Sequence, residues 1–341
     1  MKESQISTGK HIDGKEIFAL TLKNTKGSVV KIYNYGGIIS EFTVINAKGE
    51  SQDIVLGFDD LDGYLTEEYL AAYPYLGAVV GRFANRIKDG RYEIDGKAYQ
   101  MDKSLHGGIK GFDRKVWDIL PTIDPSVTLQ YVSPAGEEGF PGNLTVQLTY
   151  KLSDDNELIL DYRAFTDAPT PVNLTHHTYF NLDPDKGSVA GNIHRIPASN
   201  YLKQDADYVP TGELVPVAGT MHDFLAPRAI GANWNQDEGY DQSFVLDKPY
   251  GKFGMASETF DARSGLLLSV YTTEPIAHFY TAKHLRVNGG KGGRNYGPAD
   301  ALCVETQHAP NSVNLRDFPD TILRPGQEYH QTTVFQVTVR K

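Results

Sequence analysis

Cysteine and basic residues are scarce in this sequence of 341 residues. Cys303 is the only cysteine, which excludes an intrachain disulfide framework and the paired thiols of a zinc ribbon. The 33 lysines and arginines are outnumbered by 43 aspartates and glutamates, so the formal net charge is -10. Because nucleic acids and anionic membranes bind basic surfaces, neither is expected as a partner. A small neutral ligand is the better expectation.

Long hydrophobic runs are also absent. No segment resembles a membrane-spanning helix, and the first ten residues lack the apolar core of a signal peptide, so we expect a cytoplasmic location. The length could hold one large domain or two average ones. Since no low-complexity linker divides the chain, we expect one domain over residues 1–341 and interpret the Gly-rich stretch 288–297 as a surface loop.

The motifs of three familiar site types are missing. The stretch 288–297 does not have the Gly-x-x-x-x-Gly-Lys spacing of a phosphate-binding loop. No Gly-x-Ser-x-Gly turn connects a strand to a helix, as a serine hydrolase would require. The histidines include no His-x-x-x-His pair, so catalysis by a bound metal is not expected.

Alternation of apolar and polar residues is the clearest secondary-structure signal. It is strict over 144–152, which predicts a half-buried strand, and 157–165 is its expected hairpin partner. A second hairpin is predicted from 91–94 and 97–100, because Asp95-Gly96 suits a type I′ turn. Further strands are expected at 16–23, 28–35, 38–45, 126–132, 266–272, 276–281, 301–306 and 331–339. Many short strands and few helical signals predict an all-β fold, a large antiparallel β-sandwich with few short helices.

Two adjacent histidines, His176 and His177, lie in a run of β-branched, aromatic and amide residues at 170–182 that predicts a strand. Neighbouring side chains on a strand point to opposite faces, so only one of the pair can serve a given cavity. Such a histidine is a candidate acid or base because its ordinary pKa lies near neutrality. The alternative is a place in a buried hydrogen-bond network.

Glu305 continues the apolar face that Ala301 and Cys303 form on the predicted strand at 301–306. Partial desolvation there would raise the pKa of this carboxyl group and make it a better base. The alternative is a strand-end glutamate that reaches into water.

Three other segments carry candidate ligand-binding side chains. His106 precedes two glycines, where the backbone can turn tightly and a ligand can approach, although an ordinary loop looks the same. Asn85 and Arg86 could bind hydroxyl groups. Asp241 could accept hydrogen bonds from two sugar hydroxyls, and its alternative is a turn aspartate bonded to its own backbone.

Together these motifs resemble those of the aldose 1-epimerase family, the galactose mutarotases. Each motif has modest specificity, but their order and spacing through most of the chain are specific. The segments that carry the resemblance are 34–39, 55–58, 81–87, 105–108, 171–182, 239–241, 270–275, 302–307 and 323–326.

The resemblance implies a supersandwich with a shallow sugar cleft and no cofactor. It implies that Glu305 is the general base, His177 the general acid and His106 a second imidazole near the ring oxygen. The family's sugar-binding positions correspond to Asn85, Arg86 and Asp241.

This chain departs from the family pattern near the expected cleft. His176 stands where an amide usually precedes the acid, and we expect it to support His177 and to belong with the substrate-binding residues. His278, another expected substrate-binding residue, stands where glutamine is common, and Ala282-Lys283 replace Gly-Asn. These changes leave the preferred sugar open.

The implied reaction opens and recloses the sugar ring. Glu305 is expected to take the O1 proton while protonated His177 donates to the ring oxygen, and the reverse transfers close the other anomer of an aldohexose such as D-galactose or D-glucose. Protonation of His177 requires that burial does not depress its pKa, so we expect a nearby carboxylate or a hydrated cleft.

Three alternatives remain open at this point. The first is a sugar-binding protein without catalysis. The second is a glycosidase that uses Glu305 and Asp241 as its carboxylate pair. The third is a sugar-phosphate epimerase, which needs further cations such as Arg82 or Lys283. The sequence also leaves open whether the protein is a monomer or a homodimer.

Overall fold

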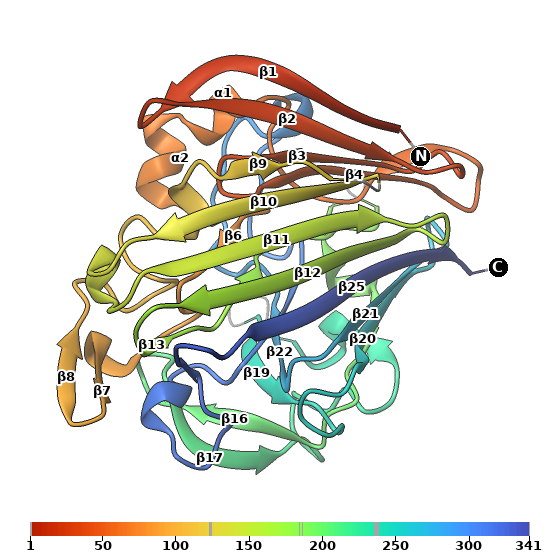
Figure 1. The fold of residues 1–341 in the computed structure, drawn as a ribbon. Coiled ribbons are helices and arrows are strands. Elements are labelled where there is room, and N and C mark those ends of the chain that lie inside the picture. The colour runs from red at the N-terminus through yellow and green to blue at the C-terminus, as the bar shows by residue number, and fades with distance from the viewer. Residues whose placement is uncertain (1, 123–124, 184, 186, 235–238, 341) are drawn as a thin grey trace.

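Strands dominate the computed structural model, which describes residues 2–122, 125–183, 185, 187–234 and 239–340 (Figure 1). Two short α-helices, α1 (Leu61–Tyr64) and α2 (Glu67–Ala72), occur in these ranges. The Asp60 side chain accepts a hydrogen bond from the first turn of α1, and Thr66 does the same for α2. None of the helices in the described ranges has the length and apolar character needed to cross a membrane.

A nine-stranded antiparallel sheet crosses the front of the molecule in Figure 1. Its side chains alternate between the core and solvent, as in β11, where every odd position of the burial pattern is buried. In spatial order the strands are β18 (Arg228–Ala229), β15 (Ile193–Arg195), β20 (Gly254–Asp261), β21 (Leu266–Thr272), β25 (Tyr329–Val339), β12 (Glu157–Thr166), β11 (Leu144–Leu152), β10 (Ser126–Ser133) and β9 (Asp118–Leu120).

Two five-stranded sheets and three short ribbons complete the strands of the described residues. The first sheet has the order β1 (Lys2–Ile12), β2 (Lys15–Lys23), β3 (Val29–Tyr33), β4 (Ile39–Ile45) and β5 (Ser51–Asp53). The second has the order β17 (Pro210–Pro216), β16 (Asn200–Gln204), β19 (Asp241–Val245), β22 (Ile276–Tyr280) and β23 (Cys303–Gln307). The ribbons are β13 (Thr170–Pro171) with β24 (Ile322–Leu323), β14 (Thr175–His176) with β6 (Val79–Val80), and β7 (Arg91–Ile94) with β8 (Lys97–Gln100).

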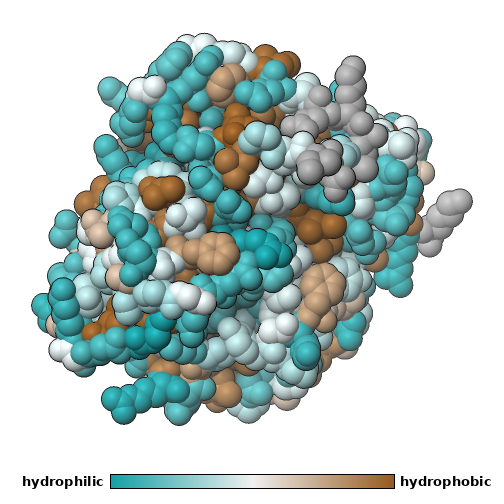
Figure 2. Space-filling view, in the orientation of Figure 1, coloured by the Kyte–Doolittle hydropathy of each residue, from teal (hydrophilic) through white to brown (hydrophobic). Residues whose placement is uncertain are grey.

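The largest cluster of buried apolar side chains joins all three large sheets. It includes Leu20 of β2, Leu148 of β11 and Phe279 of β22, each fully buried. Burial of this much apolar surface is the main stabilising contribution to such a fold. Figure 2 shows that hydrophobic residues on the outer face occur in small groups among hydrophilic ones.

The predicted fold class, an antiparallel all-β sandwich, is confirmed. Both predicted hairpins form, and Asp95 and Gly96 have the positive φ angles of 51° and 81° that a type I′ turn needs. One expectation is wrong. The run at 170–182 forms only the two-residue strands β13 and β14, because most of its backbone groups bond to loops and isolated bridges instead of a continuous neighbouring strand.

Candidate active site

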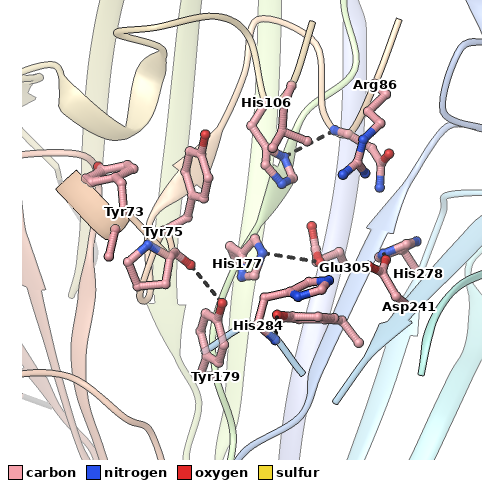
Figure 3. Close-up of a pocket in the computed structure, with 15 residues that line it drawn as sticks. Tyr73, Tyr75, Arg86, His106, His177, Tyr179, Asp241, His278, His284 and Glu305 are labelled. Atoms are coloured by element: carbon pink, nitrogen blue, oxygen red, sulfur yellow. Dashed lines mark hydrogen bonds and ion pairs between the residues drawn. The ribbon is translucent and has the colours of Figure 1, made fainter. Parts of the chain in front are cut away.

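A cavity of about 160 Å³ lies where β19, β22 and β23 meet the segments 72–75, 85–86 and 105–106 (Figure 3). Seven of the eight predicted site residues line it together, although they come from distant parts of the chain. These are Asn85, Arg86, His106, His177, Asp241, His278 and Glu305. The eighth, His176, does not line the cavity.

His177 and Glu305 face one another across this cavity. Glu305 lies in the middle of β23, whereas His177 follows β14 and is fixed by backbone bonds to Gly77 and Ala78. The Nε2 atom of His177 is 3.6 Å from Oε1 of Glu305, and the two residues are only 5% and 1% exposed. The distance exceeds that of a good hydrogen bond, so both groups can still bind a common ligand.

The second carboxylate oxygen of Glu305 has no hydrogen-bond partner in the described part of the chain. The same is true of Oδ1 of Asn85, which also belongs to a cavity-lining residue. Buried polar atoms are costly to leave unpaired, and most are therefore bonded. Two unpaired acceptors at one cavity are well suited to bind the hydroxyl groups of a ligand.

The pKa of His177 does not behave as the sequence predicts. Burial lowers it below the ordinary value, and this effect outweighs the charge of Glu305, which favours the protonated form. The charge of His278 lowers the pKa further, and Asp241 acts in the opposite direction. The expected carboxylate is therefore present, but the expectation that burial would not depress the pKa is wrong.

His106 is held as a neutral hydrogen-bond donor. Its Nδ1 accepts the backbone N–H of Asn85 at 3.2 Å, which places the ring proton on Nε2. Burial, followed by the charge of His177, holds its pKa well below the usual range. The backbone at His106 and Gly107 has φ angles of 52° and 83°, and a Cβ atom on Gly107 would lie 1.9 Å from the Gly81 carbonyl oxygen. The tight turn predicted from the two glycines is therefore present.

The ligand atoms of His106, His177 and Glu305 lie within 4.8 Å of one another, which makes them a candidate metal-binding group among the described residues. The hydrogen bonding of His106 opposes this role. Because its Nδ1 already accepts an N–H, coordination through Nε2 would require the ring to lose its remaining proton. The arrangement fits a hydrogen-bonded ligand better than a metal.

Asp241 and His278 form an ion pair that lines the cavity next to Glu305. The strand register places His278 of β22 directly between Glu305 of β23 and Ser243 of β19. His278 Nε2 donates to Asp241 at 3.0 Å, and its Nδ1 lies 2.9 Å from the Ser243 hydroxyl. Burial alone would lower the pKa of His278, but Asp241 and Glu305 raise it. Burial would likewise raise the pKa of Asp241, yet His278 lowers it to about 2.

Two cations lie against one aromatic ring near the cavity. The Arg86 guanidinium carbon is 5.5 Å from the centre of the Tyr208 ring, and the Lys283 ammonium nitrogen is 4.6 Å from it. Lys283 also donates to the Tyr208 hydroxyl at 3.2 Å. Arg86 lines the cavity directly, so this side of the site carries positive charge.

The predicted contact of His176 with substrate is wrong. Its ring points into the core, where Nδ1 lies 2.7 Å from the Thr178 hydroxyl and Nε2 lies 3.2 Å from the Gly37 carbonyl oxygen. Burial lowers its pKa to about 3, so it is neutral. His176 and His177 therefore diverge, as neighbours on an extended chain should.

Arg82 is not part of the cavity either. It is 1% exposed and donates hydrogen bonds to the carbonyl groups of Ser133, Pro141 and Gly142, among others. These bonds fasten three loop segments to one side chain. Its possible role toward a phosphate group is therefore wrong.

Several cavity residues were not predicted from the sequence, namely Tyr73, Tyr75, Tyr179, Tyr280 and His284. Tyr179 had a usable signal, because it lies two residues after His177 and so on the same side of an extended chain. Tyr75 had none. Its place depends on long-range contacts of a short loop.

Comparisons with known proteins agree on one family. The model described as aldose 1-epimerase matches residues 19–336. The galactose mutarotase of Homo sapiens is 42% identical over 323 residues, which cover 91% of each chain. The aldose 1-epimerase of Escherichia coli (strain K12) is 35% identical over 337 residues, covering 95% of this chain and 96% of that protein. The GalM/aldose epimerase homologue from C. elegans has a similar structure, with a TM-score of 0.87, 30% identity and coverage of 95% and 99%.

Proposed function

The chain belongs to the aldose 1-epimerase family, and we propose that its cavity interconverts the α and β anomers of a free aldohexose such as D-galactose or D-glucose, with Glu305 as base and His177 as acid. The enzyme is an isomerase with a small sugar as its substrate. The observation that carries the residue assignment is the pair itself: a buried carboxylate with one unpaired oxygen and an imidazole 3.6 Å away, both at one cavity.

The reaction needs one group that accepts a proton and one that donates a proton, and Glu305 and His177 take these two roles. Glu305 takes the proton from O1 while Nε2–H of His177 donates to the ring oxygen, so the bond between C1 and the ring oxygen breaks as the C1 carbonyl forms. Rotation about the C1–C2 bond then presents the other face of the aldehyde. The new hydroxyl attacks this face, returns its proton to His177, and O1 recovers a proton from Glu305.

The remaining cavity residues position the sugar. His106 offers Nε2–H to an oxygen near the anomeric centre, because its Nδ1 is engaged by the backbone. Asp241, Asn85 and Arg86 bind ring hydroxyls, and the hydrogen bond from His278 holds the Asp241 carboxylate in place. Such positioning holds the reacting atoms close to the acid and base.

One specific observation supports testing a second substrate class. Arg86 and Lys283 both lie against Tyr208 beside the cavity, where they could bind a sugar phosphate. The glycosidase alternative is less favoured, since Asp241 is bonded to His278 and has a pKa near 2, so it is not a free carboxylic acid. A sugar-binding protein without catalysis would not need the acid–base pair.

Polarimetry of freshly dissolved α-D-galactose and α-D-glucose tests the proposal. The protein should speed the approach to the equilibrium rotation in proportion to its concentration, whereas a rate equal to that of buffer at high protein concentration would overturn the enzymatic assignment. A panel of aldoses, with galactose 6-phosphate as competitor, would identify the preferred sugar. We further propose a cytoplasmic location and a monomer or homodimer. We also propose that the protein has no nucleic-acid or membrane partner, which the net charge of -10 supports.

A further inference from the structure

The acid role of His177 conflicts with its surroundings. The side chain is almost completely buried, and burial favours the neutral imidazole. Proton donation to the ring oxygen requires the imidazolium near neutral pH. Some feature of the site must therefore favour the charged form beyond the attraction of Glu305.

Two tyrosine rings cover the faces of this imidazole. The ring of Tyr179 is 4.9 Å from that of His177 at an interplanar angle of 22°, and the ring of Tyr75 is 5.9 Å away at 20°. Figure 3 shows His177 between the two tyrosines. The face of an aromatic ring carries negative charge density and attracts a cation within about 6 Å, most strongly where water is excluded. Both rings satisfy this geometry.

Hydrogen bonds fix the stack of Tyr75, His177 and Tyr179. The Tyr179 hydroxyl donates to the Pro74 carbonyl oxygen at 2.8 Å, so one tyrosine bonds to the residue that precedes the other. The backbone N–H of Gly77 donates to His177 at 3.0 Å, and that of His177 donates to Ala78 at 2.8 Å. These bonds join the loop at 74–78 to the segment 177–179 and fix the three rings relative to one another.

The edges of the imidazole are also occupied. Nδ1 lies 3.5 Å from the Cys303 sulfur, and burial holds the pKa of this thiol well above its usual range, so the sulfur is uncharged. A neutral sulfur can accept the Nδ1–H bond weakly. The opposite nitrogen faces Glu305. An imidazolium would therefore have a weak acceptor for Nδ1–H, and its Nε2–H would face the Glu305 carboxylate across 3.6 Å.

The other titratable groups around His177 do not stabilise its imidazolium in the way that the ring faces of Tyr75 and Tyr179 can. His106 is neutral and meets His177 edge-on at 5.4 Å, and Tyr280 does so at 6.0 Å. The charge of His278 disfavours a second imidazolium, while that of Asp241 favours it. These two charges oppose each other and are paired.

We propose that Tyr75 and Tyr179 are positioning residues that hold His177 as the imidazolium between their ring faces. This inference rests on the proposed acid role of His177. It assigns to the two rings a function in proton transfer that is separate from sugar contact. The hydroxyl of Tyr179 serves only to fasten the stack.

The test is the pH profile of kcat/KM for Tyr179→Leu beside Tyr179→Phe. Leucine removes the ring face, so the fall of kcat/KM at high pH, the alkaline limb of the profile, should move to lower pH by up to about one unit. Phenylalanine keeps the face and should leave this limb in place. At pH values below both alkaline limbs the leucine variant should retain most of the parental rate, and above both limbs it should lose up to about tenfold. A second pair, Tyr75→Leu and Tyr75→Phe, gives an independent measurement.

An NMR titration of the His177 ring protons in folded Tyr179→Leu, Tyr75→Leu and parental protein measures the pKa of His177 directly. It therefore distinguishes a changed pKa from a loss of activity caused by misfolding. A lower midpoint in either leucine variant supports the proposal. Parental midpoints and limbs in both leucine variants would overturn it, even if His177→Asn abolishes turnover and the proposed function stands. If His177→Asn keeps the parental rate, both the proposed function and this inference fail.

Discussion

The Nε2 atom of His177 lies 3.6 Å from Oε1 of Glu305, which is longer than a good hydrogen bond, and the second carboxylate oxygen of Glu305 has no hydrogen-bond partner among the described residues. A shorter separation would join the two groups in a hydrogen bond and neutralise the pair. A much longer one would prevent them from acting on the same anomeric centre. The observed spacing suits a proton donor and a proton acceptor that share one substrate.

Replacement of His278 by glutamine should raise the pKa of His177. The charge of His278 is one of the causes that lower this pKa, and glutamine is neutral. The acid form of His177 should then persist to higher pH, so the alkaline limb of kcat/KM should move upward, opposite to the shift expected for Tyr179→Leu. The pH profile of His278→Gln beside the parent measures this. A downward shift would contradict the electrostatic account.

Replacement by asparagine should affect the adjacent residues His176 and His177 differently. His176 bonds to Thr178 and Gly37 in the core, so His176→Asn should destabilise the fold by about 1–3 kcal/mol while leaving turnover within about tenfold of the parent. His177→Asn removes the proposed acid and should lower kcat by about 10² to 10⁴-fold. Urea unfolding and polarimetry on both variants check this. Equal losses of turnover would show that the two roles are not distinct.

The ion pair between Asp241 and His278 should contribute stability over a limited pH range. The folded pKa of Asp241 is about 2 against an ordinary 3.8, so its contribution is present above about pH 4 and is lost as the pH falls toward 2. The folded pKa of His278 is raised above 6.5, so its contribution is present below 6.5 and is lost as the pH rises through the folded value. The pair therefore stabilises most between these limits.

Asp241→Asn should accordingly be least stable, relative to the parent, near pH 5 to 6, by roughly 2 kcal/mol. The difference should shrink toward pH 2 and again above the folded pKa of His278. Urea unfolding at a series of pH values measures it. A difference that is constant with pH would contradict the proposed pair.

Lys283→Asn distinguishes the two substrate classes. If Lys283 binds a phosphate group beside Arg86, the variant should weaken inhibition by galactose 6-phosphate by about tenfold or more and leave the KM for galactose nearly unchanged. Lys252→Asn, at an exposed position, serves as the matched control. Equal inhibition of the parent and both variants would remove the sugar-phosphate alternative.

Much of the fold was predictable because its signals are local. Alternation identified β11 and β12, and the Asp95-Gly96 pair identified the β7–β8 turn, since each depends on neighbouring residues only. Strands such as β16 and β17 were missed. Their burial patterns are irregular, and a bulge shifts their pairing between Leu202 and Gln204.

Site residues were predictable where they lie on a strand with regular alternation of its side chains. Glu305 continued the face of Cys303, and the structure places it at the cavity wall. Tyr75 could not be found in this way, because it lies in a loop with a positive φ of 60° whose position depends on a bond between Tyr179 and Pro74, 105 residues apart. The pKa of His177 was equally out of reach, since burial is a property of the whole fold.

The central claim is that Glu305 transfers the O1 proton, and Glu305→Gln tests it most directly. Glutamine keeps the shape of the side chain but is not a base, so kcat for anomer exchange, measured by polarimetry or NMR, should fall by about 10² to 10⁴-fold. Galactose should still bind with nearly parental affinity, and Glu258→Gln on β20 should keep full activity. Parental turnover by the Glu305→Gln protein would contradict the account.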